Sequence, residues 1–279
     1  MSLVTTGKLV EEAHINGKCV PAFNVGSMEM VRGAVKAAEE LNVPIIIQIA
    51  ERLLKYSPLE LMGPMMVQAA RESRVDIAVN MDHCRDLAVM KRALDYGFTG
   101  VMYDGSTDPY EDNIRGTIEA VKLASSYGAS TEGELGLVGG SEDGLSDHGI
   151  KCTNPDLSRD FCEKTGISCL AVAIGNAHGD YPTAPELAFD VLEQINMKAG
   201  KPLVLHGGSG LTDEDFQKAV SLGISKINIG TASFNKVTQS AGEYLQEPGK
   251  HTFFQMSTAM TNGMYLNALR HIKVFNSME

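Results

Sequence analysis

The chain has 279 residues, of which 43% are hydrophobic and 21% are charged, with 28 glycines and 10 prolines. This composition is typical of a folded globular protein, and it excludes collagen, a coiled coil and wholesale disorder. The formal net charge is −11, without runs of Lys or Arg. Because phosphate neutralisation needs clustered cations, we expect no nucleic-acid partner.

The cysteines and the N-terminus bear on the compartment. The five cysteines are scattered and include no CxxC pair, which predicts a reducing, cytoplasmic setting rather than a disulfide framework. The first residues lack the basic and apolar segments of a signal peptide, so we expect none. No apolar run reaches the roughly 18 residues of a membrane span, so we also expect no membrane partner.

In chain order, short apolar runs alternate with longer amphipathic stretches. The apolar runs predict strands at Cys19–Asn24, Pro44–Ala50, Asp76–Asp82, Thr99–Asp104, Ala129–Glu134, Cys169–Gly175, Pro202–His206 and Ile224–Ile229. The amphipathic stretches predict helices at Met28–Leu41, Pro58–Arg71, Asp86–Tyr96, Pro109–Tyr127, Asp156–Thr165, Ala184–Ala199, Asp213–Leu222 and most of the segment from Ala232 to the end.

A strand followed by a helix, repeated with short connections, predicts parallel strands joined by crossover helices. The strands are nearly all apolar, as expected when both faces are covered. Eight such units favour an α/β fold of the (β/α)8 TIM-barrel type, formed by residues 1–279 as a single domain with a C-terminal helical extension. A doubly wound open sheet is the alternative.

Side chains that can bind a metal or titrate stand at the ends of most predicted strands. They are Asn24, Asp82, His83, Asp104, Glu134, His178, His206 and Asn228. The carboxyl ends of barrel strands surround one mouth, where active sites are built. We therefore expect these side chains to converge.

Three histidines of this set, His83, His178 and His206, suit a catalytic Zn²⁺, which takes three protein ligands and keeps a fourth position for substrate. A single histidine is more often structural, but three at strand ends favour a metal. Because Zn²⁺, Co²⁺ and Fe²⁺ all accept imidazole, the metal stays open.

Glycine-rich turns follow the last two predicted strands. Gly207, Gly208 and Ser209 lead into one helix, and residues 228–231 lead into the next. Backbone N–H groups at helix starts bind anions, and barrels commonly hold phosphate at these two loops. The segment 136–151 is long, glycine-hinged and acidic. It predicts either a lid that delivers a general base or a solvated Ω-loop.

Several motifs occur in one order that resembles the class II, metal-dependent ketose-bisphosphate aldolases, a family that includes fructose- and tagatose-bisphosphate aldolases. The motifs are Asp82-His83, Glu134-Leu135-Gly136, Gly139-Gly140-Ser141-Glu142-Asp143-Gly144, Ala177-His178-Gly179, His206-Gly207-Gly208-Ser209-Gly210 and Lys226-Ile227-Asn228-Ile229. The resemblance implies a cytoplasmic homodimer or homotetramer. Such an enzyme cleaves a ketose phosphate reversibly into dihydroxyacetone phosphate and an aldehyde, through a metal-stabilised enediolate.

The resemblance also implies roles for individual residues. Asp82 resembles the acid that protonates the aldehyde oxygen, and Glu142 resembles the lid base that takes a proton from dihydroxyacetone phosphate. The zinc ligands are implied to be His83, His178 and His206, with Asp104 and Glu134 near a second or resting metal position. The implied phosphate, monovalent-cation and ketose contacts are Gly179, Gly207, Ser209, Asn228, Thr231 and Asn24.

The sequence departs from the family at the aldehyde end. The family's serine after the second strand falls on Ala50, and Glu51-Arg52 is similar to an Asp-Arg pair of the inositol-catabolic branch, whose aldehyde carries a carboxylate. Arg52 could bind such an anion bidentately, or could form a surface pair with Glu51. Residues 249–256 also lack the Arg that the family uses for a distal phosphate. We therefore expect an aldolase whose aldehyde is not necessarily glyceraldehyde 3-phosphate.

Three alternatives stay open at this point. A Schiff-base aldolase needs a buried lysine near a strand end, and Lys226 would sit deep in the barrel. A metal-dependent hydrolase or epimerase could use the same barrel. A non-catalytic sugar-phosphate-binding barrel could keep the binding residues without turnover.

Overall fold

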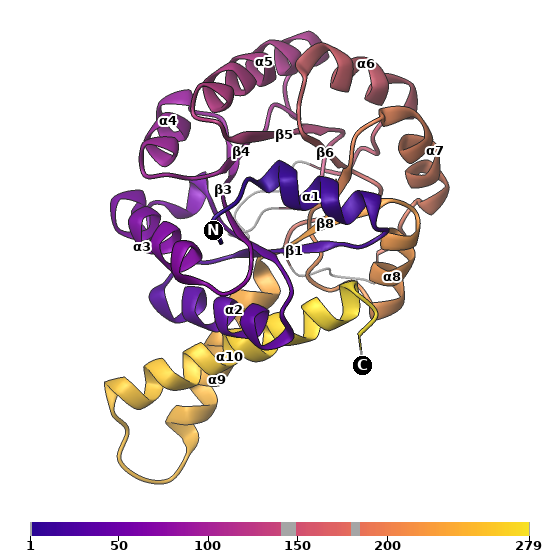
Figure 1. Ribbon diagram of the computed structural model, residues 1–279. Helices are drawn as coiled ribbons and strands as arrows, with labels where there is room; N and C mark the ends of the chain where they lie inside the picture. Colours follow the sequence, from indigo (N-terminus) through magenta and orange to yellow (C-terminus); the bar gives the residue numbers. More distant parts are fainter. Residues whose placement is uncertain (1, 141–148, 180–184, 279) are drawn as a thin grey trace.

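The computed structural model describes residues 2–140, 149–179 and 185–278. In these residues, eight parallel strands hydrogen-bond in chain order and close into a barrel, with helices around the outside (Figure 1). The prediction of a TIM barrel is confirmed, and the open-sheet alternative is wrong, because β1 pairs with β8.

The observed strands lie within one to three residues of the predicted bounds at most ends. They are β1 Val20–Asn24, β2 Ile45–Ala50, β3 Ile77–Cys84, β4 Gly100–Tyr103, β5 Ser130–Leu135, β6 Cys169–Val172, β7 Leu203–Leu205 and β8 Ile224–Ile229. The helices are α1 Thr6–Ile15, α2 Met28–Leu41, α3 Leu59–Glu72, α4 Leu87–Asp95, α5 Tyr110–Ser126, α6 Pro155–Thr165, α7 Phe189–Ala199, α8 Asp213–Ser221, α9 Thr231–Gln246 and α10 Phe253–Phe275, with a 3-10 turn at Glu51–Leu53.

Two helical regions differ from the sequence pattern. Helix α1 was not predicted; it lies across the amino end of the barrel (Figure 1), and its Leu9, Val10 and Ala13 join the interior cluster. The end of the barrel supplies the apolar surface that this short helix needs. The local signals, an N-cap at Thr5 and the spacing of Leu9, Val10 and Ala13, were missed because the segment precedes the first predicted strand. Helix α7 begins at Phe189 rather than at the predicted Ala184, which lies outside the described residues.

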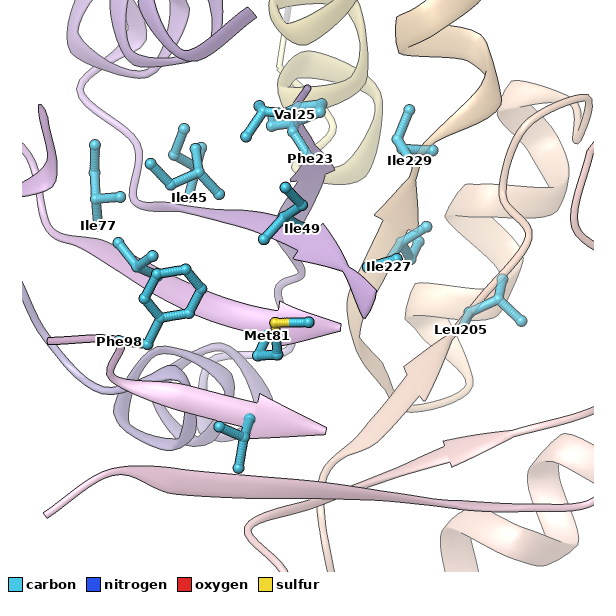
Figure 2. Packing of buried hydrophobic residues seen from close by; sticks show 14 of the residues in the cluster. Phe23, Val25, Ile45, Ile49, Ile77, Met81, Phe98, Leu205, Ile227 and Ile229 are labelled. Carbon is cyan, nitrogen blue, oxygen red and sulfur yellow. The ribbon is translucent and has the colours of Figure 1, made fainter. Parts of the chain in front are cut away.

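Strand residues alternate between two apolar clusters. Large aliphatic side chains such as Ile45, Ile77 and Leu205 point outward against the helices (Figure 2). Residues between them point into the barrel, where the parallel registers put side chains of neighbouring strands in one layer, as with Ile46 beside Ala78. Both faces are therefore buried, which explains the nearly continuous apolar runs.

The C-terminal extension is a helical hairpin. Helix α10 packs along α2, and the end of the α9–α10 hairpin projects beyond the barrel (Figure 1). The side chains of Phe253 and Phe254 near this end are 69% and 80% exposed. Within the described residues, no helix combines the length and the apolar character needed to cross a bilayer.

The loops at the carboxyl end of the barrel approach each other closely. Gly207, directly after His206, has a φ of 63°. A Cβ at this position would lie 2.1 Å from the carbonyl oxygen of Ala177. Only glycine therefore lets the segment after β7 rest against the segment that carries His178.

We expect Gly207→Ala to destabilise the protein far more than Gly17→Ala. Gly17 has a similar φ of 60°, but a Cβ there meets open space. In the control Gly17→Ala, the free energy of unfolding should therefore fall only by the cost of placing alanine in the left-handed region, about 1–2 kcal/mol. Urea unfolding measures both free energies, and equal losses would contradict the close contact at Gly207.

Candidate metal centre and active site

The predicted site residues come together at the carboxyl ends of the strands. Among the described residues, His83, His178 and His206 each offer a ring nitrogen, and these atoms lie within 4.8 Å of one another. A second set, made of His83, Asp104 and Glu134, meets the same criterion. Side chains on β3 and β5, and on the segments that follow β4, β6 and β7, therefore share one mouth, as the barrel geometry predicts.

An irregularity in β3 brings two adjacent residues to this mouth. Neighbouring residues of a regular strand point to opposite faces. The pairing of β3 with β4 shifts between Met81 and Cys84, and His83 has a φ of 41°, which is rare for a residue with a side chain. Asp82 and His83 therefore both face the site, and such backbone strain is often found at functional positions.

Two of the three histidines use one ring nitrogen to contact a carboxylate. His83 Nδ1 lies 2.8 Å from Asp104 Oδ2, and His206 Nε2 lies 2.8 Å from Glu132 Oε1. The other nitrogens, His83 Nε2 and His206 Nδ1, face each other at 2.8 Å. When both carboxylates accept a ring N–H, the facing atoms carry lone pairs. They then need a cation between them, either a proton or a metal ion.

A buried carboxylate oxygen of Glu134 also indicates a cation at this site. Its Oε2 atom is buried and has no hydrogen-bond partner among the described residues, and it lies 3.9 Å from the Nδ1 atoms of His83 and His206. An unpaired buried oxygen is costly, whereas imidazole and carboxylate groups together suit a divalent transition metal. The donor set therefore fits such a metal, with His83, His178 and His206 as the residues that would hold it.

The pKa values of the histidines indicate that a bound metal would replace a proton. Burial disfavours a charged His83 ring, but Asp82 and Asp104 outweigh it and raise the His83 pKa to about 10. A proton therefore occupies the facing nitrogens when no metal is bound, and metal binding must release it. Burial, followed by the charges of His83 and His206, lowers the pKa of His178 well below its usual value. The His178 ring is therefore neutral, as a ligand must be.

Asp82 is held by two amides. Its side chain is fully buried; Oδ2 accepts a hydrogen bond from Asn24 Nδ2 at 2.9 Å, and Oδ1 accepts one from Asn228 Nδ2 at 3.2 Å. Gln48 Nε2 donates to Asn24 Oδ1 at 2.9 Å, which orients that amide. The carboxylate is thus fixed beside His83, and the expected contacts of Asn24 and Asn228 with substrate stay predictions.

The predicted phosphate residues lie on adjoining loops. Gly208 N donates to Asn228 O at 3.3 Å, and Ala232 N donates to Ser209 Oγ at 2.9 Å. Thr231 is the first residue of α9, which has no side-chain cap at its N-terminus. Gly207 and Gly179 each follow a histidine of the metal site, with φ values of 63° and 86°. Backbone N–H groups at adjoining loops and at a helix start can bind a phosphate, so the phosphate role of these residues stays a prediction.

A cavity of about 550 Å³ adjoins the metal site. Its lining includes His83, His178, Glu134 and two arginines, Arg52 and Arg85. Arg52 comes from the 3-10 turn after β2, and its charge contributes to the lowered pKa of His178, so it lies near the site. Glu142, the predicted lid base, lies outside the described residues.

The sequence analysis did not include Glu132, and it considered Lys226 only as a Schiff-base candidate and as part of a motif. Glu132 contacts His206, and its second oxygen lies 2.7 Å from Lys226 Nζ. Burial would raise the pKa of Glu132, but Lys226 and His206 lower it to about 2. Glu132 stands two residues before Glu134 and therefore faces the same side of β5, which is the signal that could have revealed it. Lys226 keeps its proton, so it is a poor Schiff-base nucleophile.

Comparison with known proteins agrees with this geometry. The family model of class II fructose-bisphosphate aldolases matches residues 4–279. A sulfofructosephosphate aldolase from Alkalicoccus urumqiensis is 35% identical over 280 residues, covering 99% of this chain and 98% of the relative. A fructose-bisphosphate aldolase from Geobacillus stearothermophilus is 38% identical over 248 residues, covering 88% of this chain and 86% of the relative.

A solved structure extends the similarity to three dimensions. The crystal structure of the YdjI aldolase from Escherichia coli K12 superposes with a TM-score of 0.86 at 32% identity, covering 98% of this chain and 97% of that chain. The matches span the barrel, the three histidines and the C-terminal helices. The chain therefore belongs to the class II fructose-bisphosphate aldolase family, and it is a metal-dependent ketose-phosphate aldolase, a carbon–carbon lyase.

Proposed function

We propose that the metal is Zn²⁺ and that the enzyme reversibly cleaves a ketose phosphate into dihydroxyacetone phosphate and an aldehyde that carries a carboxylate or sulfonate group. The observation that supports this most is the metal site itself, in which three histidine nitrogens within 4.8 Å adjoin the buried carboxylates of Asp82 and Glu134. Zn²⁺ favours such imidazole donors and keeps one position for substrate.

The roles of the chain's own residues follow from the chemistry of the cleaved bond. The metal, when bound, acts as a Lewis acid for the negative charge that develops on the dihydroxyacetone-phosphate fragment. In the cleavage direction, Asp82 takes the proton of the hydroxyl that becomes the aldehyde, and it returns this proton in the reverse direction. Glu142 transfers the proton of the carbon next to the carbonyl: it removes this proton from dihydroxyacetone phosphate and returns it after cleavage. The backbone N–H groups of Gly207, Ser209 and Thr231 would bind the phosphate.

Proton exchange tests the half-reaction without knowledge of the aldehyde. In D₂O with zinc-loaded protein, we expect the NMR signal of the two equivalent C3 protons of dihydroxyacetone phosphate to fall to half its intensity, because one of them is exchanged for deuterium. A chelator should abolish this exchange and added Zn²⁺ should restore it, because the charge on the fragment needs the metal. No exchange by fully loaded protein would count against the proposed function.

Two variants separate the two proton transfers within this experiment. Glu142→Gln should abolish exchange, because the base that acts on the C3 carbon is lost. Asp82→Asn should retain exchange and lose cleavage, because its proton belongs to the aldehyde half. Loss of exchange in Asp82→Asn, with metal content unchanged, would contradict this division of roles.

Arg52 supports an anionic aldehyde. It lines the cavity with His83 and His178, and Ala50 stands where the family's serine would meet a phosphate. A guanidinium binds a carboxylate or sulfonate through two parallel hydrogen bonds. One relative is a sulfofructosephosphate aldolase, and the name of that enzyme indicates a substrate with a sulfo group.

An aldehyde panel tests this role. With dihydroxyacetone phosphate, we expect carboxylated or sulfonated aldehydes to react in preference to glyceraldehyde 3-phosphate. Arg52→Ala should lower kcat/KM for the preferred aldehyde about 10- to 100-fold, the loss expected for a charged hydrogen-bond donor, and should leave C3 exchange intact. Arg74→Ala is the matched control, since Arg74 is an exposed arginine paired with Glu39.

Two results would contradict an Arg52 anion site. One is efficient cleavage of fructose or tagatose 1,6-bisphosphate in preference to the carboxylated and sulfonated substrates. The other is an equal loss in Arg52→Ala for charged and uncharged aldehydes.

We also propose that the enzyme is a homodimer or homotetramer. The exposed Phe253 and Phe254 at the projecting hairpin offer the aromatic contacts that are enriched in protein interfaces. Light scattering of the wild-type protein should give a mass of two or four chains of 30.0 kDa each, and replacement of both phenylalanines by Ser should lower the mass of the assembly. A wild-type monomer would contradict the proposal.

A further inference from the structure

Lys226 is a charged residue at the centre of an apolar barrel. It lies on β8, its side chain has 0% exposure, and its registered neighbours are Val20 on β1 and Val204 on β7. Within the described residues, Lys226 Nζ forms its ion pair with Glu132 Oε2 on β5, at 2.7 Å. A buried ion pair seldom stabilises a fold more than apolar residues of the same size. Its place under the metal site therefore calls for a functional explanation.

Glu132 connects this lysine to a metal ligand. One carboxylate oxygen, Oε2, accepts from Lys226 Nζ at 2.7 Å, and the other, Oε1, lies 2.8 Å from His206 Nε2. With both oxygens engaged, the carboxylate cannot rotate without breaking a buried contact. Asn228 Nδ2 also lies 3.2 Å from His206 Nε2. The shorter, charged contact to Glu132 decides that Nε2 carries the proton, which leaves the Nδ1 lone pair for a metal.

His83, on the other side of the metal site, is oriented by a carboxylate that is held in a different way. His83 Nδ1 is also oriented by a carboxylate, that of Asp104. Asp104 is partly exposed and is held by Ser106, which donates to Asp104 Oδ1 through its hydroxyl at 2.7 Å. Glu132 lies too deep for solvent, and among the described residues its cationic support is Lys226. The two histidines thus differ in what holds their carboxylate.

We propose that Lys226 is a positioning residue of the metal centre: through Glu132 it fixes the tautomer and the ring orientation of His206 that metal binding requires. The proposal rests on the metal dependence of the family and deepens the proposed function. Orienting carboxylates commonly change metal affinity 10- to 100-fold when they are removed. Here we extend that influence to the lysine behind the carboxylate.

The primary variant is Lys226→Met, which keeps the length of the side chain and removes its charge. In the apo protein, we expect competition with a chromophoric chelator to show a 10- to 100-fold weaker affinity for Zn²⁺. We also expect ¹⁵N NMR of the apo protein to show a single Nε2–H tautomer for His206 in the wild type and a mixture in the variant. A purely structural lysine would change neither readout in a protein that still folds.

Cys169→Ala is the matched control. Cys169 is buried in the same interior cluster, and its Sγ lies 3.7 Å from the same Glu132 oxygen that Lys226 contacts. Its thiol is a weak donor, so we expect zinc affinity within twofold of the wild type. An equal loss in this control would show that any interior change disturbs the site, which would overturn a specific role for Lys226.

A comparison within the Glu132→Gln background keeps the test decisive if Lys226→Met does not fold. The double variant Glu132→Gln with Lys226→Met removes both buried charges and retains an oxygen that can accept from His206. If Lys226 acts through Glu132, adding Lys226→Met to Glu132→Gln should change the Zn²⁺ affinity by no more than about twofold. A further loss of about 10-fold or more in the double variant would overturn the proposal, as would wild-type affinity and tautomer in a folded Lys226→Met.

The test of Lys226 does not depend on catalytic activity. If the wild type binds Zn²⁺ but exchanges no proton of dihydroxyacetone phosphate, the proposed function fails while the role of Lys226 can still be measured. If the wild type binds no divalent metal, the positioning role is overturned with it.

Discussion

The closure of eight parallel strands into one barrel is the constraint on which the metal centre depends. Because every strand runs in the same direction, the carboxyl ends of β3, β6 and β7 surround one mouth, and histidines separated by long stretches of chain come within 4.8 Å of one another. The barrel is kept rigid by apolar clusters on both faces of the strands. Such a scaffold can hold two ring nitrogens at 2.8 Å, an arrangement that needs a cation between them.

The interior beneath the mouth is specialised for this task. Apolar layers fill most of the barrel, but Glu132 and Lys226 lie fully buried among them. Charges in such a position contribute little to stability, and the strain at His83 adds a further cost. The two apolar clusters, outside and inside the strands, thus supply the fold stability. Glu132, Lys226 and the end of β3 serve the geometry of the site.

The two halves of the reaction have different structural support. In the proposed reaction, the dihydroxyacetone-phosphate half would use the histidines, Asp82 with its two amides, and the adjoining loops after β7 and β8. The aldehyde half would use a cavity of about 550 Å³ whose lining includes Arg52 and Arg85. Within one family, the common chemistry can therefore stay constant while the far end of the cavity selects the substrate.

The sequence by itself determined the strand and helix alternation, the barrel, the three histidines and Asp82, because these depend on local periodicity and on residue types at strand ends. It did not reveal α1, whose apolar face has meaning only against the end of the barrel. Nor did it reveal the contacts of Glu132 and Lys226, which lie on different strands and meet only when the barrel closes. The orientation of the His83 and His206 imidazoles was likewise decided by tertiary structure, because a contact with a carboxylate distant in sequence determines which ring nitrogen is left for a metal.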